Sequence, residues 1–515
     1  MIQQVQIRLT PEDAASPEKV RKAALKKSGA GPQAEVAIRK RSIDARQQQV
    51  MMQLVVDVAE NEAIPQPDFT LRQYPSVAQK PEVHIVGCGP AGLFAALTCI
   101  QKGYKPVILE RGKNVRDRRR DLARINREQI VHPDSNYCFG EGGAGTYSDG
   151  KLYTRSDKRG NVRSVLETFV QFGASPDILV DAHPHIGTNK LPQIISSIRT
   201  YIEAHGGEVH FEKRVTAIHH KGGKLSTLEC NAAEMIPVRR VILATGHSAR
   251  DIYFMLESSG IAVEFKPFAM GVRIEHPQVF IDTMQYHRTD RGDLLPPAAY
   301  SFVRKTGDRS AYSFCMCPGG IIAPCATASQ EVVTNGWSPS KRNNPFANSG
   351  FVVGVGEADV AHLSHHGALR GLVFQMEVER AAWNAGGRTQ MAPAQRMTDF
   401  VQQKQSANLP ECSYQPGLTS VDMHAVLPSF IAESLKDAFL QLQKIQPIYF
   451  TNEAVVVGVE SRTSAPVRIP RDSDSLQHPQ IAGLFPSGEG GGYAGGIVSA
   501  AIDGSKVAEM ACLNL

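Results

Sequence analysis

The chain has 515 residues, which is more than one hydrophobic core usually holds and indicates two or three domains. Hydrophobic residues make up 42% and charged residues 21%, as in an ordinary globular protein. The nine cysteines include no CxxC pair, which argues against a disulfide scaffold, a zinc cluster and a CxxC-type disulfide reductase. The N-terminus MIQQVQIRLTPED lacks the apolar core of a signal peptide, and no apolar run approaches the roughly 20 residues that cross a bilayer. We therefore expect a cytoplasmic protein with reduced thiols, no membrane span and no metal site.

Residues 1–75 predict a small α+β domain of ferredoxin-like type. Ser16 is placed to cap a helix that has Pro17 in its first turn, runs to about Lys27 and stops at Gly29. Strands are predicted at 4–9, 36–39 and 50–58, with residues 42–46 between the last two. The prolines at 65, 67 and 75 are typical of an extended linker.

Positive charge is concentrated in the same domain. Residues 1–50 hold ten Lys/Arg and five Asp/Glu, an excess equal to the formal net charge of +5 of the whole chain. A local basic face can attract an anionic partner such as RNA. A solvated surface is the commoner explanation, and the cluster lacks interleaved aromatics for stacking on bases. Nucleic acid therefore remains the alternative partner.

From residue 82 the pattern becomes β-α-β. Residues 83–86 predict a strand, the loop GCGPAG follows at 87–92, and a helix is expected from there to about Lys102. Residues 107–109 predict the next strand, which ends at Glu110. This is the dinucleotide-binding pattern in the strand–loop–helix–strand context that it requires.

The residues of this segment have separate roles in such a site. Gly87 permits the tight turn, Gly89 lets the backbone approach a pyrophosphate, and Gly92 lets the helix pack on the strand. The N-terminus of the helix offers free N–H groups to the phosphates, and Glu110 is expected to accept hydrogen bonds from the adenosine ribose. The candidate cofactor-binding residues here are Gly87, Gly89, Pro90, Ala91, Gly92, Glu110 and Arg111.

Three further features favour FAD over NAD. Pro90-Ala91 within the loop and the triplet ERG at 110–112 resemble flavoprotein oxidoreductases. Residues 241–246 form an apolar strand that ends in an ATG turn, where flavoproteins of the glutathione-reductase superfamily return to the cofactor. A second glycine-rich segment at 483–497 begins a helix whose N-terminus could stabilise negative charge on a reduced flavin. These features add Ala244, Thr245, Gly246, Gly488, Glu489, Gly495, Gly496 and Ile497 to the candidate cofactor-binding residues.

The whole chain resembles a family of uncharacterised FAD-dependent dehydrogenases of bacteria. The matching stretches are 136–154 (NYCFGEGGAGTYSDGKLYT), 244–251 (ATGHSARD), 266–278 (KPFAMGVRIEHPQ), 313–320 (SFCMCPGG), 460–469 (ESRTSAPVRI) and 483–504. The resemblance implies an α/β fold with a Rossmann-like FAD-binding domain, interrupted by an inserted substrate domain, and it supplies no substrate. It also implies that Gly142 and Gly143 lie beside the isoalloxazine ring, that Val215 meets the adenine, and that Glu489 contacts the ribityl or pyrophosphate region. Lys151 follows at the mouth of the site, near flavin N5 or a substrate anion. Lys151 is equally compatible with a surface lysine after a turn.

We expect four segments: a small α+β domain at 1–75, the first part of the FAD-binding domain at 81–265, the inserted domain at 266–450 and the rest of the FAD-binding domain at 451–515. In the inserted domain, helices are expected near 368–384 and 429–444. Residues 354–357 (GVGE) lack the third glycine of a second fingerprint, so a built-in NAD(P)H domain is not expected. NAD(P)H would bind transiently, or the substrate itself would reduce the flavin.

Hydride transfer by a flavin needs little acid–base machinery, so the catalytic residues are single candidates. Cys315 and Cys317 form a CxC pair that suits a redox disulfide, one reactive thiolate, or buried structural thiols. Arg273 and Glu275 share one face of a predicted strand, which favours a structural ion pair over a carboxylate clamp. His276 is a candidate proton carrier.

Three more side chains are candidates near the substrate. Arg462 and Arg468 flank the sequence TSAP and would suit an anionic substrate, with structural pairing equally compatible. Tyr493 is surrounded by glycines, which suggests a ring placed against flavin or substrate. The leading hypothesis is an FAD-dependent oxidoreductase of a small organic substrate. The alternatives are an RNA-associated flavoprotein that binds through the basic N-terminal domain and, last, a lipid-handling reductase at a membrane surface.

Overall fold

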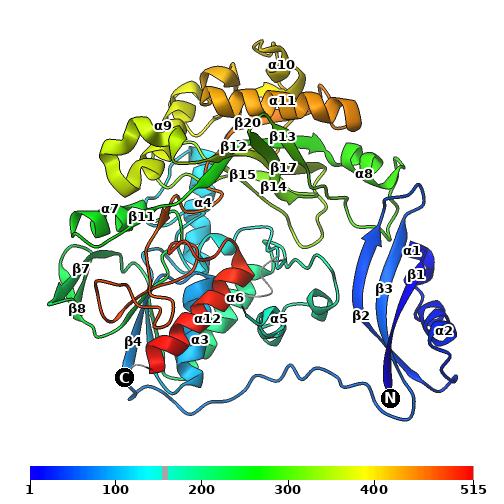
Figure 1. Cartoon of the computed structure of the whole chain (residues 1–515), viewed down its shortest axis with the longest axis horizontal. Coiled ribbons are helices and arrows are strands. Elements are labelled where there is room, and N and C mark those ends of the chain that lie inside the picture. The colour runs from blue at the N-terminus through cyan, green and yellow to red at the C-terminus, as the bar shows by residue number, and fades with distance from the viewer. Residues whose placement is uncertain (154–159, 514–515) are drawn as a thin grey trace.

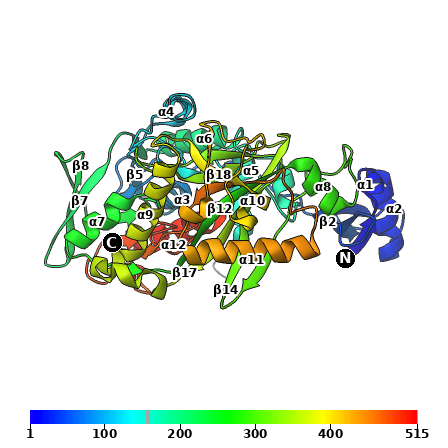
Figure 2. The same cartoon turned by 90° about the horizontal axis from the view of Figure 1, so that it is seen from above.

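The computed structural model describes residues 1–153 and 160–513, and it contains three units, each built around a sheet (Figure 1). The matched stretch 136–154 ends at Thr154, which lies outside the described residues. The N-terminal unit lies at one end of the molecule, and a long extended segment joins it to the second unit (Figures 1 and 2). This segment, residues 60–81, contains no helix or strand and packs Phe69, Leu71 and Tyr74 against the second unit.

The N-terminal unit is an antiparallel sheet in the order β1-β3-β2 with two helices. Ser16 caps the longer helix and Gly29 ends it at a φ of 76°, both as predicted. The element order βααββ lacks the second helix–strand pair of the ferredoxin-like order βαββαβ, so the unit is α+β of a shorter type. Residues 42–44, predicted to separate two strands, continue the second strand. The elements are β1 (Ile2–Leu9), α1 (Pro11–Ala14), α2 (Pro17–Ser28), β2 (Glu35–Asp44) and β3 (Met51–Ala59).

The second unit is built on a five-stranded parallel sheet in the order β6-β5-β4-β10-β22. In chain order this is 3-2-1-4-5, the order of doubly wound dinucleotide-binding sheets. Its strands are β4 (Glu82–Val86), β5 (Lys105–Leu109), β6 (Glu208–His210), β10 (Val241–Leu243) and β22 (Leu484–Pro486).

Helices α3 (Pro90–Gln101) and α12 (Ile497–Leu513) pack closely on each other beside this sheet (Figure 1). The contact depends on Gly504, where an added Cβ would lie 2.1 Å from the carbonyl oxygen of Ala91. A small antiparallel sheet carries Val215, the residue expected to meet the adenine, at the start of its first strand. The remaining elements of this unit are α4 (Val115–Glu128), η1 (Gly143–Gly145), α5 (Val162–Gln171), η3 (Pro176–Leu179), α6 (Leu191–Ala204), β7 (Val215–Lys221), β8 (Lys224–Cys230), β9 (Glu234–Pro237) and α7 (Arg250–Ser258).

The third unit contains a seven-stranded sheet in the order β13-β14-β17-β12-β20-β18-β19, antiparallel except for its last pair. Strand β20 (Val455–Glu460) lies between β12 and β18, so it belongs to this sheet and not to the C-terminal segment predicted to begin at residue 451. Its other strands are β12 (Phe268–Pro277), β13 (Val303–Thr306), β14 (Arg309–Cys317), β17 (Phe346–Val355), β18 (Ala392–Arg396) and β19 (Leu418–Ser420).

Helix α11 (Ser429–Ile445) covers the face of this sheet that is turned away from the second unit (Figure 1). It and α9 (Arg370–Ala385) agree with the two helices predicted in this part of the chain. No helix among residues 1–153 and 160–513 combines the length and apolar character needed to cross a membrane. The remaining elements are α8 (Gln278–Tyr286), β11 (Glu264–Phe265), β15 (Ile321–Pro324), β16 (Thr334–Trp337), η4 (Ala358–Leu369), α10 (Met397–Gln402), η5 (Met423–Ala425) and β21 (Val467–Arg468).

Candidate functional site

A cavity of about 2080 Å³ has walls from all three units. The second unit contributes residues 86–91, the third contributes 313–316, and the N-terminal unit contributes 41–46. Arg41 ties the N-terminal unit to the second unit, because its backbone N–H donates to Val180 at 2.9 Å and its guanidinium lies 2.7 Å from Asp181. The N-terminal unit is therefore a wall of the cavity.

The loop at 87–92 folds as its glycines predict. Gly87 has a φ of 104°, and an added Cβ there would lie 2.4 Å from the carbonyl oxygen of Ala244. At Gly92, an added Cβ would lie 2.0 Å from the carbonyl oxygen of Gly87. Gly89 lines the cavity, and the nearest protein atom to an added Cβ is 3.9 Å away, on Gly143. Gly87 and Gly92 are thus required by the loop itself, whereas the absent side chain of Gly89 leaves room in the cavity.

Glu110 is 4% exposed and joins two glycine-rich loops. Its Oε2 accepts a hydrogen bond from the backbone N–H of Cys88 at 2.9 Å. Its Oε1 accepts from the N–H groups of Gly112 at 2.8 Å and Gly140 at 3.0 Å. A carboxylate oxygen can accept two hydrogen bonds, so Oε2 retains acceptor capacity for a ribose hydroxyl.

Arg111 lines the cavity but is occupied by protein partners. It lies 2.7 Å from Asp134 and 2.8 Å from Asp251, and its guanidinium stacks on Phe139 at 4.2 Å. These contacts hold the segment that follows β5 in place. Arg111 therefore has a structural role beside the cofactor end of the cavity.

Two buried charged residues that the sequence analysis missed hold the loop at 140–146. Arg118 is completely buried and donates to the carbonyl oxygens of Asn136, Tyr137 and Glu141 at 2.8–2.9 Å. The carboxylate of Glu141 accepts from the N–H of Val115 and pairs with Arg199 at 2.8 Å. The sequence shows a cluster of arginines at 116–120, within α4. Nothing in the pattern indicates that Arg118 is the buried one.

The loop that these residues hold lies directly against the dinucleotide loop. Gly142 donates from its N–H to the carbonyl oxygen of Cys88 at 2.8 Å, and its φ is 78°. Gly143 lines the cavity opposite Gly89 and begins the short 3-10 turn η1. The two glycine loops, each expected to contact the cofactor, are therefore in direct contact with each other.

The C-terminal glycine segment reaches the same cavity. Residues 244–249, Glu489 and residues 495–500 line it, as does Val215. Neither Gly495 nor Gly496 would meet a protein atom within 4 Å on gaining a Cβ, so the start of α12 is open toward the cavity. Glu489 lies 3.5 Å from Nδ1 of His247, and Gly488 stands behind the lining with its N–H donating to Asp503 at 2.7 Å.

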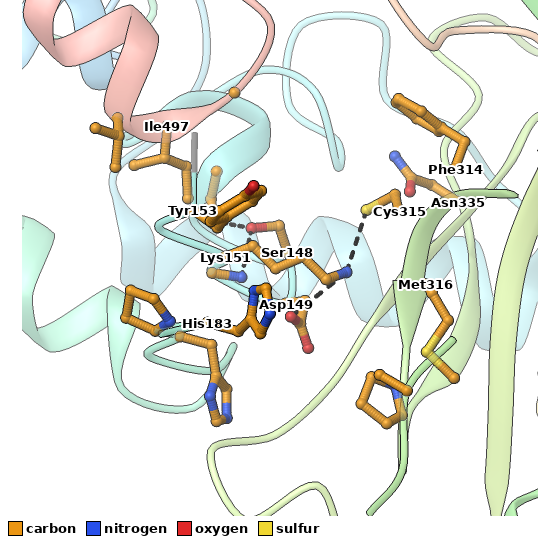
Figure 3. Close-up of a pocket in the computed structure, with 18 of the residues that line it drawn as sticks. Ser148, Asp149, Lys151, Tyr153, His183, Phe314, Cys315, Met316, Asn335 and Ile497 are labelled. Atoms are coloured by element: carbon orange, nitrogen blue, oxygen red, sulfur yellow. Dashed lines mark hydrogen bonds and ion pairs between the residues drawn. The ribbon is translucent and has the colours of Figure 1, made fainter. Parts of the chain in front are cut away.

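Lys151 and Cys315 point toward each other in the cavity (Figure 3), and Cys317 is buried beside them. The ammonium of Lys151 is 3.5 Å from Sγ of Cys315, 3.4 Å from Sγ of Cys317 and 3.5 Å from Asp149. Burial opposes the charge of Lys151, but the carboxylate of Asp149 and the two sulfurs raise its pKa above the usual value. Arg342 pairs with the same carboxylate at 2.9 Å. Two of the predicted candidates, 164 residues apart in the sequence, thus form one cluster.

Arg273 does not form the ion pair predicted with Glu275. It is fully buried and pairs with Glu460 on the neighbouring strand β20 at 2.8 Å, while Glu275 accepts hydrogen bonds from Ser413. His276 is also fully buried outside the cavity lining, with Nε2 bonded to the carbonyl of Tyr449 at 2.7 Å. Burial lowers the pKa of His276 to about 4, which removes it as a proton carrier at neutral pH.

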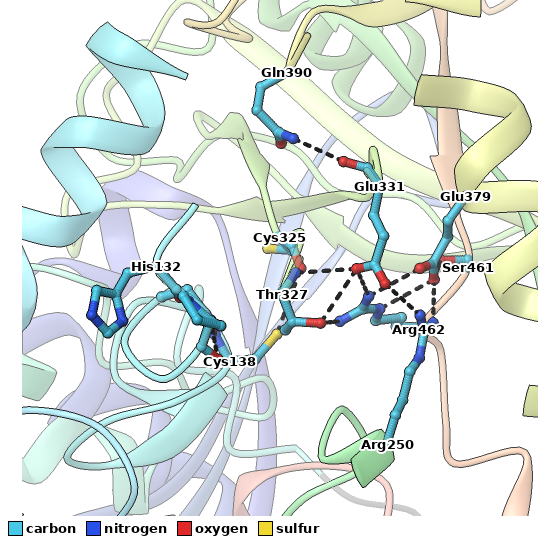
Figure 4. Close-up of polar contacts among 12 residues, drawn as sticks. His132, Cys138, Arg250, Cys325, Thr327, Glu331, Glu379, Gln390, Ser461 and Arg462 are labelled. Carbon is cyan, nitrogen blue, oxygen red and sulfur yellow. Dashed lines mark hydrogen bonds and ion pairs between the residues drawn. The ribbon is translucent and has the colours of Figure 1, made fainter. Parts of the chain in front are cut away.

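Arg462 belongs to a buried ion cluster (Figure 4). It lies 2.7 Å from Glu331 and 2.9 Å from Glu379, and Arg250 pairs with the same two carboxylates at 2.9 and 2.7 Å. Because Arg250 begins α7 of the second unit and both acids belong to the third, this cluster joins the two units. Arg462 also lines the cavity, but its guanidinium is held by these two carboxylates.

Tyr493 lies outside the cavity lining. Its ring packs under the guanidinium of Arg471 at 3.7 Å and near that of Arg468 at 5.6 Å, and its hydroxyl donates to the carbonyl of Ile469 at 3.2 Å. The structure therefore does not support the prediction that this ring contacts flavin or substrate. The ring packs against protein instead and supports the loop at 488–496.

Comparison with known proteins places this site in a family. Residues 267–463 match the family model "FAD-dependent protein, C-terminal domain-like", and residues 1–59 match "Domain of unknown function (DUF8436)". An uncharacterized protein of Clostridium beijerinckii is 40% identical over 429 residues, which cover 82% of this chain and 79% of that one. The chain belongs to this family of FAD-dependent proteins. Its cofactor is FAD.

Solved structures resemble the chain more distantly. CtdE in complex with FAD is 12% identical, with 84% of each chain covered and a TM-score of 0.32. A geranylgeranyl bacteriochlorophyll reductase-like protein from Thermoplasma acidophilum is also 12% identical, with 84% of this chain and 78% of that one covered and a TM-score of 0.32. Similarity at this level carries no information on substrate or reaction.

The residues present fit FAD. The cavity is larger than the roughly 300–1,000 Å³ of common ligand pockets, as an extended dinucleotide requires. The open positions at Gly89, Gly495 and Gly496 are places where backbone faces free space, next to the N-termini of α3 and α12. A helix N-terminus presents unpaired N–H groups and positive dipole, which suit a pyrophosphate and an electron-rich ring.

Proposed function

We propose that this chain is an FAD-dependent oxidoreductase that acts on a small anionic organic substrate. The observation that carries the proposal is one continuous cavity, which runs from the glycine loop to the cluster of Lys151 and Cys315. Bound FAD supplies hydride transfer, and the chain has to hold the cofactor, orient the substrate and exclude water.

The second unit would hold FAD as a Rossmann-type domain of the glutathione-reductase-like kind. The N–H groups at the start of α3, exposed beside Gly89, would bind the pyrophosphate, and Glu110 would bind the ribose through the free capacity of Oε2. Val215 would pack on the adenine. The open N-terminus of α12 at Ile497 would face the flavin, whose negative charge in the reduced state it would stabilise.

The charge of the cavity supports an anionic substrate. Its lining contains ten Lys/Arg and six Asp/Glu. Arg111, Arg342 and Arg462 are paired with carboxylates, so the support comes from the other cations of the lining, such as Lys341. Lys151, Lys341, Arg342 and Arg291 belong to the part of the lining near the third unit, and Arg41 of the N-terminal unit belongs to the same lining. The N-terminal unit would thus close the substrate end and screen it from water.

An anaerobic screen tests the proposal. The FAD-loaded protein is mixed with organic acids, with their neutral amides or methyl esters, and with NADH and NADPH, and loss of the flavin absorbance is followed. We expect at least one acid to reduce the flavin and its neutral analogue to do so at least tenfold more slowly, about 1.4 kcal/mol of discrimination. Equal rates for acid and neutral analogue would contradict the anionic preference. Reduction by NADH or NADPH alone would identify a transient external donor.

The RNA alternative has less support. Arg39, Arg41 and Arg46 of the N-terminal unit are paired with Asp57, Asp181 and Asp44. RNA binding would show as retention on an RNA column that falls with salt and disappears when residues 1–75 are deleted.

A further inference from the structure

Strand β14 ends in a bulge that carries both cysteines of the CxC pair. Its register with β17 shifts between Phe314 and Cys317, so that Cys315 and Met316 together face a single residue of the partner strand. Cys315 has a φ of 47°, a left-handed conformation that few non-glycine residues adopt. A bulge re-aims side chains, and here Cys315 lines the cavity whereas Cys317 is fully buried behind it.

The unusual backbone of the bulge is held by buried side chains. Nη1 of Arg273 donates to the carbonyl oxygen of Cys315 at 3.3 Å, and the same guanidinium is fixed by Glu460 at 2.8 Å and by Asn348 at 2.7 Å. A strained residue persists only where its surroundings enforce it, and such residues concentrate at functional sites. Arg273 is therefore a positioning residue for the bulge.

The surroundings of the two sulfurs distinguish them chemically. A hydrogen bond from Cys317 lowers the pKa of the Cys315 thiol well below its usual value; burial opposes this shift, and Lys151 and Arg273 add to it. The pKa of Cys317 is raised by the same hydrogen bond and by burial. The acidic groups that also act on the pair are Asp149 and Glu460. Both shifts favour the thiolate at Cys315 over the thiolate at Cys317.

We propose that Cys315 and Cys317 form a redox-active dithiol that reduces small disulfides entering the cavity, with Cys315 as attacking thiolate and Cys317 as resolving thiol. The order follows from burial, because Cys315 is partly exposed and lines the cavity, whereas Cys317 is buried and does not. Lys151, 3.4–3.5 Å from both sulfurs, is the positioning cation.

The exchange balances without a further reagent. The thiolate of Cys315 attacks one sulfur of the small disulfide, forms a mixed disulfide and releases the other half as a thiolate. The sulfur of Cys317 then attacks Cys315, its proton passes to the departing thiolate, and the second half leaves as a thiol. The dithiol loses two electrons to the small disulfide. The exchange is independent of FAD, whereas the return to the dithiol needs the same number of electrons and rests on the proposed flavin function.

Thiol mapping tests the exchange. The full-length FAD-loaded protein is reduced, freed of reductant, treated with glutathione disulfide, alkylated and mapped by mass spectrometry. We expect the wild-type peptide to contain a Cys315–Cys317 disulfide, and Cys317→Ser to retain one glutathione on Cys315. Cys412→Ser, which removes a partly buried thiol elsewhere, should behave as wild type. The idea fails if both thiols of the wild type remain alkylatable, or if Cys317→Ser acquires no glutathione.

The role of Lys151 has its own readout. In Lys151→Met the rate of glutathione addition at neutral pH should fall about tenfold, with its pH profile displaced upward, because a positive charge beside a thiol favours the thiolate. Lys151→Arg should restore the profile, and identical profiles in all three proteins would refute the assignment. The same mapping on Gly89→Val, which we expect to lack FAD, separates the two proposals, since the exchange should persist there.

Discussion

Gly89→Val tests where the pyrophosphate binds. Gly89 caps α3 with φ −79° and ψ −173°, an extended conformation that valine adopts readily. The nearest protein atom to an added Cβ is 3.9 Å away, so the protein leaves room for a Cβ at this position. The new side chain would instead occupy the part of the cavity proposed for the phosphates.

The expected loss of FAD affinity follows from the contacts that would be lost. Displacing the pyrophosphate from the start of α3 removes two or more hydrogen bonds to a charged group, each worth about 1.5–3 kcal/mol. A loss of about 3 kcal/mol corresponds to a roughly 100-fold weaker Kd. The unfolding midpoint of the FAD-free protein should change little, because the fold of the loop depends on Gly87 and Gly92.

Flavin content after purification and a fluorescence titration of the FAD-free protein with FAD measure the effect. Gly354→Val is the matched control, since Gly354 lies in β17 outside the cavity lining and an added Cβ there meets nothing within 4 Å. We expect the control to bind FAD as the wild type does. A folded Gly89→Val protein with wild-type Kd would show that the pyrophosphate does not bind at this loop.

Three further outcomes concern buried charges. Arg118→Met removes the donor of the buried carbonyl oxygens of Asn136 and Tyr137 and leaves that of Glu141 with Thr146 alone, so it should lower the free energy of unfolding by about 3 kcal/mol in a denaturant titration and reduce flavin content. Burial raises the pKa of Glu275 to about 7 from 4.5, so the folded state keeps a proton that the unfolded state loses, and stability falls by about 3 kcal/mol as pH rises through that window. Glu275→Gln should flatten that fall in unfolding experiments at a series of pH values. Arg462→Met leaves Glu379 with fewer buried partners and should cost about 3–5 kcal/mol, whereas an unchanged midpoint would show that Arg250 alone suffices.

The cofactor end of the site could be predicted because its signals are local. The turn at Gly87, the start of α3 and the acid at the end of β5 follow one another within one β-α-β unit, and each has a fixed offset from the last. The part of the site around Lys151 could not be predicted in this way. Lys151 reaches Cys315 across 164 positions, and no periodicity within either segment specifies that meeting.

The wrong partner for Arg273 has a simple physical cause. Residues two apart on a strand share a face, but long side chains also reach diagonal neighbours on the adjacent strand, about 7–8 Å away. Arg273 lies opposite Val457, and Glu460, opposite Gly271, is its diagonal neighbour. The pattern along one strand does not show such a partner. Glu460, on β20, is 187 positions away in the sequence and was accessible only through the sheet order.

The two ends of the cavity are built on different sheets. Contacts between the two units therefore have to fix the position of one end relative to the other. The ribbon of β11 and β21 and the cluster of Arg250, Glu379 and Arg462 supply this link (Figure 4). Buried ion pairs contribute little net stability but tolerate few alternative arrangements, because a displaced charge would be left without a partner. Relative movement of the two units would break several such pairs at once. The distance between the glycine loop and the Lys151 cluster is therefore set before any ligand binds, which is the condition for orienting a substrate against a cofactor held on another sheet.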